Sequence, residues 1–358
     1  MFVAWRDLRF ARGRFALIAA VVALITLLVG FLAGLSGGLA SQNVSAVLAL
    51  PGDRIVLEDP DKGEPSFSES SLDKATIEAW RKADGVDAAV PIGIGQGRAT
   101  HEGQPIAVAL FGVPTDAGSS GVGDLAPHKA DEIGLSAGAA DQLEAKKGDK
   151  ITIAEKTYTV AEVSGDLWYS HTPVVTMTPD AWEATDKALG GTGEATALVV
   201  SGDADWKAIA KDTGTVADGH IASLSALETF KSEIGSLGLM IAMLFGVSAL
   251  VVGAFFTVWT MQRAGDIAVL KALGASTASL VRDALGQALI VLVVGIGVGL
   301  IAVIGFGTLA SQALPFLLNP WTTLAPALAM AVLGLAGAAF ALRTVTHADP
   351  LTALGSNR

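Results

Sequence analysis

The sequence predicts an α-helical membrane protein with four transmembrane helices and an inserted extracytoplasmic α+β domain. Three observations indicate this fold class: 51% of the 358 residues are hydrophobic against 16% charged, several long stretches carry no charge, and one segment of mixed composition, residues 40–232, follows the first of these stretches. Cysteine is absent, which excludes disulfide frameworks, thiolate metal sites and cysteine nucleophiles.

The uncharged stretches define the membrane spans. The first is longer than the roughly 20 apolar residues that cross a bilayer, and longer than the apolar core of a cleaved signal peptide, so we expect it to be retained. The last uncharged stretch holds two spans, because Pro315 and Pro320 interrupt it and leave 312–323 as an external turn. The predicted spans are 15–39, 234–261, 284–311 and 324–343.

Basic residues flank the spans on one side. Four arginines precede the first span, three basic residues lie between the second and third spans, two follow the fourth, and the turn 312–323 has none. Because an excess of Lys and Arg marks the cytoplasmic side, we expect both termini inside the cell membrane and the large segment outside it. The cytoplasmic parts would be 1–14, which reads as an interfacial amphipathic helix, 262–283 and the tail 344–358.

The external segment 40–232 carries 30 acidic and 15 basic residues, which disfavours nucleic acid as a partner. Its size and alternating apolar runs predict an independent α+β module. It contains no H-E-x-x-H or G-x-S-x-G motif, and we assign no catalytic residue. Strands are expected over 54–59, 104–113, 150–165, 173–178 and 195–202, and helices over 70–85, 136–149 and 203–214.

Trp168, Tyr169 and His171 form the one place in this segment where aromatic and imidazole side chains crowd together. Such a cluster indicates either a lip that faces a ligand or the packed end of a strand. The sequence leaves both interpretations open.

Two short motifs carry a family resemblance. The string GDIAVLKALGAS, residues 265–276, resembles the coupling segment of the MacB and FtsX type of ABC transporter permease, and the closing DPLTAL, residues 349–354, is similar to the terminal signature of that family. The four spans, the large first external domain and the amphipathic start agree with it. One departure is Asp266, where a Glu is common in the family, a change that keeps the charge and shortens the side chain.

The resemblance implies a homodimer of this permease on two copies of a separate ABC ATPase subunit. The chain has no G-x-x-x-x-G-K-[ST] phosphate loop, so we expect it to be no enzyme by itself and ATP-Mg to be bound by the partner subunit. The segment 262–283 would contact that ATPase, and a simple amphipathic connector is the alternative interpretation. The candidate coupling residues are Arg263, Gly265, Asp266, Lys271 and Gly274.

Small residues in the spans allow close contacts between helices. Gly30 with Gly34, and Gly295 with Gly299, are small-x-x-x-small pairs of the kind that let backbones approach in lipid. Such pairs are compatible with dimerisation.

The build of the chain is similar to that of the haem-exporting members of the family, so haem is the expected transported ligand, with membrane lipid around it and no intrinsic cofactor. Glu233 is the main candidate ligand of haem iron, because an ionisable group at the membrane boundary is costly and a carboxylate can ligate iron. The other candidates are Glu228, Met240 and Met243 near it in the sequence, and His171 on the external domain. A snorkelling carboxylate and methionines that only pack are the alternatives.

Two other functions stay open from the sequence. The chain could export peptides or lipoproteins as MacB-type members do. It could instead be an FtsX-like protein that transports nothing and transmits the motion of the ATPase to a cell-wall hydrolase. An adjacent hydrolase gene would favour that last alternative.

Overall fold

The computed structural model describes residues 12–346 except 61, 116–120, 263–264, 266–268 and 270–273. The chain divides into two compact units. We call the first, Met1–Gly38 with Ser236–Arg358, the membrane unit, and the second, Leu39–Gly235, the external unit. The helices α2 and α8 contribute residues to both.

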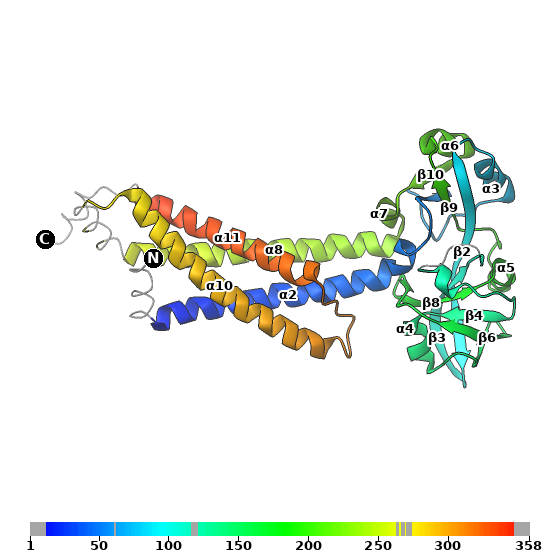
Figure 1. Ribbon diagram of the computed structural model, residues 1–358, viewed down its shortest axis with the longest axis horizontal. Coiled ribbons are helices and arrows are strands. Elements are labelled where there is room, and N and C mark those ends of the chain that lie inside the picture. The colour runs from blue at the N-terminus through cyan, green and yellow to red at the C-terminus, as the bar shows by residue number, and fades with distance from the viewer. Residues whose placement is uncertain are drawn as a thin grey trace. The chain divides into compact units, whose positions relative to one another are not determined.

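The membrane unit contains helices that are long and apolar enough to cross a bilayer, four in the described part of the chain (Figure 1). This finding, together with the strand-rich external unit, confirms the predicted fold class. The helices are α2 (Arg12–Leu48), α8 (Glu228–Gln262), α10 (Thr277–Ala310) and α11 (Pro320–Thr346).

Glycines let α2 approach its neighbours closely. A Cβ atom added at Gly34 would lie 2.3 Å from the ring of Phe316, and one at Gly38 would lie 1.7 Å from the carbonyl oxygen of Pro315. The glycines of residues 34–38 therefore serve packing and do not end the helix. As a result α2 continues to Leu48, beyond residue 39, where the sequence suggested the end of the span.

The glycine pair of α10 packs against α2 of the same chain. A Cβ atom at Gly295 would lie 2.7 Å from Val22, and one at Gly299 would lie 2.6 Å from Thr26. Small side chains at these positions thus bring the two helix backbones together. From the sequence, these glycines were compatible with dimerisation. In the structure they bring together two helices of the same chain.

The described residues of the external unit form one connected sheet of ten strands. Its strands are β1 (Arg54–Glu58), β2 (Val86–His101), β3 (Gln104–Gly112), β4 (Glu132–Leu135), β5 (Lys150–Ile153), β6 (Lys156–Val163), β7 (Trp168–Tyr169), β8 (Thr172–Met177), β9 (Ala197–Gly202) and β10 (Thr215–Asp218). The helices between them are α3 (Lys74–Arg81), α4 (Ala137–Leu143), α5 (Pro179–Ala188), α6 (Trp206–Thr213) and α7 (His220–Ser223), with short 3-10 turns η1 (Gly123–Leu125) and η2 (Leu224–Ala226).

The long strand β2 belongs to two layers of this unit. Its second half pairs with β3, and the order β3-β8-β4-β6-β5 returns to β2 through the pair Ala99 and Ile153. These pairings close a small barrel, which leaves its strands no free edge there. The barrel is filled by buried side chains that include Leu110, Ile133 and Tyr158.

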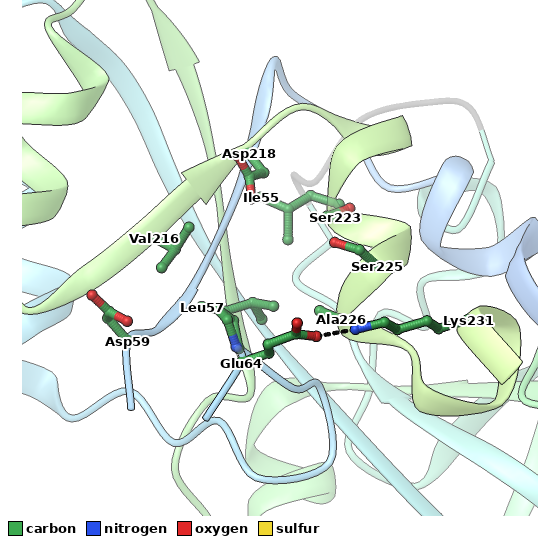
Figure 2. Close-up of a pocket in the computed structure, with 11 residues that line it drawn as sticks. Ile55, Leu57, Asp59, Glu64, Val216, Asp218, Ser223, Ser225, Ala226 and Lys231 are labelled. Atoms are coloured by element: carbon green, nitrogen blue, oxygen red, sulfur yellow. Dashed lines mark hydrogen bonds and ion pairs between the residues drawn. The ribbon is translucent and has the colours of Figure 1, made fainter. Parts of the chain in front are cut away.

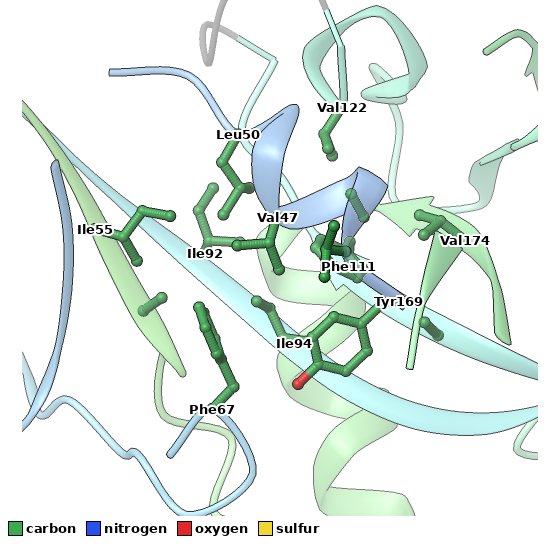
Figure 3. Packing of buried hydrophobic residues seen from close by; sticks show 14 of the residues in the cluster. Val47, Leu50, Ile55, Phe67, Ile92, Ile94, Phe111, Val122, Tyr169 and Val174 are labelled. Atoms are coloured by element: carbon green, nitrogen blue, oxygen red, sulfur yellow. The ribbon is translucent and has the colours of Figure 1, made fainter. Parts of the chain in front are cut away.

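The first half of β2 completes a second sheet of order β10-β1-β9-β2. On one face of it α3 and α6 pack, with the Trp80 side chain fully buried. The other face covers the end of α2, where Val47 and Leu50 insert among Ile55, Phe67 and other apolar side chains (Figure 3). The last turns of α2 are therefore part of the external core, which fixes them relative to the strands.

The structure departs from the expected elements at several places, and β4, β7, β10, α5 and α7 are among the elements that were not predicted. The expected strand 150–165 is two strands, because Ala154 and Glu155 both adopt positive φ and form a tight turn. The strand β2 was not predicted, since its Pro and Gly residues are typical of turns. Here Gly93 is needed for packing, because a Cβ atom there would lie 2.2 Å from the Trp182 ring.

Candidate ligand site at the start of α8

Glu233 lies in the first turns of α8, where it meets groups from two distant segments of the external unit. The Asn43 amide nitrogen donates a hydrogen bond of 3.1 Å to Glu233 Oε2, and the two residues are 190 apart in the sequence. The His171 imidazole Nε2 lies 3.2 Å from the same oxygen. The side chains of Glu233 and His171 are 19% and 38% exposed, so both remain accessible from solvent.

A tight hairpin turn presents His171. Strands β7 and β8 are joined by Ser170 and His171 alone, and φ is +47° at Ser170 and +63° at His171. A two-residue turn with both φ values positive normally takes Asn or Gly, because a Cβ atom is strained in this region. The sequence therefore accepts strain at the position that carries the imidazole, which is common at functional sites.

The end of α2 holds this turn in place. The backbone N–H of Ser170 donates to the Asn43 carbonyl, and that of His171 donates to the Gln42 carbonyl, each at 3.0 Å. The Ser45 hydroxyl accepts a bond of 2.8 Å from the N–H of Trp168. These bonds offset the strain of the turn and fix where the imidazole points.

Asn43 connects the three segments of the site. Its side chain is fully buried, its amide nitrogen donates to Glu233, and its amide oxygen accepts a bond of 2.9 Å from the Thr229 hydroxyl of α8. The Thr229 hydroxyl also lies 3.3 Å from that of Ser170. Sequence analysis did not single out Asn43, because Ser41, Gln42 and Ser45 are polar neighbours and only the structure shows that Asn43 is the buried one.

The aromatic residues next to His171 face inward. Trp168 and Tyr169 are buried, and the Tyr169 ring packs edge-on against Phe67 and Phe111 (Figure 3). Burial raises the pKa of the Tyr169 phenol above its usual value, which keeps the group neutral. The packed-strand interpretation therefore holds for Trp168 and Tyr169, while His171 faces the carboxylate.

The remaining candidate ligands lie elsewhere on α8. Glu228 is its first residue and is exposed. Met240 and Met243 belong to the membrane unit and are 48% and 64% exposed. The structure thus brings His171 to Glu233, and it leaves both methionines open to lipid or to another chain.

Part of the expected coupling segment is described. Gly265 lies in a helical turn, and Gly274 has φ +91°, a conformation that favours glycine. Two residues later the Ser276 hydroxyl caps α10 by accepting from the N–H of Ser279. Arg263, Asp266 and Lys271 lie outside the described residues, as do 1–11 and 347–358.

Residues 238–350 match the family model described as the FtsX-like permease C-terminal domain. The chain carries an FtsX-like permease domain. The matched segment includes GDIAVLKALGAS, residues 265–276, and confirms the family resemblance that the sequence indicated. Permeases of this family work with a separate ATPase and are not themselves ATPases.

Relatives that match this chain over its full length have names that refer to hemin. A protein of Staphylococcus haemolyticus, provisionally named hemin transport system permease protein HrtB, is 25% identical over 357 residues, which cover 99% of each chain. Its namesake in Staphylococcus epidermidis is 23% identical over 359 residues and 100% of each chain. Among solved structures, the periplasmic region of MacB from Actinobacillus actinomycetemcomitans aligns with 50% of this chain and 94% of its own, at 11% identity and a TM-score of 0.36.

Proposed function

We propose that this chain is the permease subunit of an ABC efflux pump that exports haem from the membrane outward. Two copies of the chain would form a homodimer on two copies of a separate ATPase. Both termini would lie in the cytoplasm and the external unit outside the cell membrane. The full-length similarity to relatives named for hemin transport supports the choice of substrate.

The pairing of Glu233 with His171 carries the proposal. A bare metal ion commonly takes four or more ligands, whereas haem iron already has four porphyrin nitrogens and needs only one or two axial ligands. A carboxylate and an imidazole at 3.2 Å, both partly exposed, offer ligands of the right type and number. Haem iron would bind the Glu233 carboxylate or the His171 imidazole, and the two side chains would then no longer pair with each other. The strained turn would present the imidazole.

The ATPase would drive release through the cytoplasmic segment 262–283. Arg263, Asp266 and Lys271 are the charged residues that we propose to contact it, and Gly265 and Gly274 would allow the backbone to turn there. Closure of the ATPase would narrow the space between the two α8 helices of the dimer. This movement would expel the bound haem.

The test is a titration of the full chain, purified with its ATPase, with haemin while the Soret band is recorded. We expect a stoichiometric shift, and a loss of affinity of about 10- to 100-fold in Glu233→Gln because an axial ligand is removed. His171→Gln is expected to change the Soret spectrum as well.

Two matched variants serve as controls. Glu162→Gln removes a carboxylate that is paired with Lys147, and His101→Gln removes an imidazole 4.0 Å from Asp149. Both are expected to bind haemin as the unmodified chain does. A complex that gives no Soret shift would refute haem export. A Glu233→Gln variant with unchanged affinity would refute the assignment of the ligand site to Glu233. Either result leaves the permease domain as it stands.

A further inference from the structure

A second site lies on the opposite side of β1 from α3 and α6. It is a pocket of about 350 Å³ between the strands β1 and β10, the turn η2 and the start of α8 (Figure 2). Its floor is apolar and includes Ile55 and Leu57 of β1 and Val216 of β10. All of these residues belong to the external unit.

The rim of this pocket is predominantly acidic. Asp59, Glu64 and Asp218 contribute three carboxylates, and Lys231 of α8 contributes one ammonium group. Lys231 forms an ion pair with Glu64, drawn as the dashed line in Figure 2, and both side chains are exposed. An exposed ion pair is weak and easily exchanged. The rim therefore favours a cation, placed beside an apolar group on the floor.

The strand at the edge of the sheet favours an extended peptide as the ligand. The strand β10 ends the sheet order and pairs only with β1 among the described strands. An edge strand can accept an extended peptide through backbone hydrogen bonds. On such a peptide, residues two apart point to the same face.

Val216 and Asp218 are two apart on β10 and both line the pocket. A peptide strand beside β10 would place one side chain next to each of them. Complementarity requires an apolar side chain beside Val216 and a basic one beside Asp218.

We propose that this pocket binds an extended segment of an extracytoplasmic partner protein in which a Lys or Arg and an apolar residue alternate with one residue between them. The segment adds a strand to β10 and inserts both side chains into the pocket. The incoming basic group lies beside the carboxylates of the rim, one of which now pairs with Lys231. The acidic rim disfavours haem propionates, and the residues that line this pocket do not include Glu233, His171 or Asn43.

The probe is a fluorescent nonapeptide with Lys and Leu alternating at every second position and Ser between them, titrated by anisotropy onto the full chain in zwitterionic nanodiscs. A peptide of the same composition, with Lys and Leu on opposite faces, is the matched control. We expect the first peptide to bind more tightly than the second, and its binding to weaken as salt rises. Equal binding of the two peptides would overturn the proposal.

Variants of the chain make the test specific. Lys231→Gln removes the competing cation and is expected to tighten binding about two- to fivefold, while Asp218→Asn is expected to weaken it by a similar factor. Ser225→Trp fills the pocket without changing the charge and is expected to abolish binding. Lys207→Gln makes the same charge change on α6, across the sheet, and is expected to have no effect. Weaker or unchanged binding in Lys231→Gln, or unchanged binding in Ser225→Trp, would refute the assignment.

Discussion

Asn43 shows how much one buried side chain contributes to the geometry of the site. Its amide group bonds to Glu233 and to Thr229, and its backbone carbonyl accepts from the hairpin turn. A buried polar group is stabilising only while its partners are in place, and its loss leaves those partners unpaired. The position of Glu233 therefore depends on a residue of a different helix.

Replacement of Asn43 by Leu is expected to destabilise the protein by about 1–3 kcal/mol, because Glu233 and Thr229 lose a buried partner. The measurement is the thermal or denaturant unfolding of the purified chain in detergent. Gln42→Leu is the matched control, since its backbone bond to the turn is kept. Equal stability of the two variants would show that the amide network contributes nothing.

The conformation of the β7–β8 hairpin, like the position of Glu233, depends on contacts with a segment far away in the sequence. Its two turn residues both have positive φ, and bonds to the end of α2 hold them there. Such a turn is less stable than one with glycine, so the sequence has retained a strained element where the imidazole is needed. A substitution at Ser170 can relieve this strain and leave the His171 imidazole in place.

Ser170→Gly is expected to stabilise the protein by about 1 kcal/mol, because glycine adopts positive φ without a clash at Cβ. Ser170→Ala removes the same hydroxyl but keeps the Cβ atom, and it is expected to give no gain. The unfolding midpoints of both variants, compared with that of the unmodified chain, provide the measurement. A glycine variant no more stable than the alanine variant would contradict the expected strain.

Acidic and basic residues are distributed unevenly over the whole molecule. Basic residues gather in the short segments next to the spans, while residues 40–232 carry twice as many acidic as basic residues. This asymmetry predicts the orientation in the membrane, because positive segments are retained in the cytoplasm. The absence of cysteine gives a direct way to test it.

Single cysteines placed on the exposed surface should react according to side. We expect a membrane-impermeant maleimide to label Lys207→Cys and Gln312→Cys in intact cells, and Ala278→Cys only after permeabilisation. The unmodified chain, which has no cysteine, sets the background. Labelling of Ala278→Cys in intact cells would reverse the proposed orientation.

The sequence by itself determined the membrane helices, the inserted domain and the family resemblance. These features depend on the transfer free energy and charge of each residue and on short local motifs, so they can be predicted without knowing what packs where. Glu233 and His171 were each predicted as candidates for the same reason, from their own chemistry. Only the tertiary structure brought them to 3.2 Å of each other and added Asn43.

The tertiary structure also decided the roles of residues whose local preference indicated something else. Gly93 and Pro91 are typical of turns, yet they lie in β2 because Trp182 and the pairing with β9 fill the space around them. Gly295 and Gly299 serve contacts within one chain for the same reason. Packing between segments far apart in sequence overrides local propensity, because the area buried outweighs the preference of a single residue.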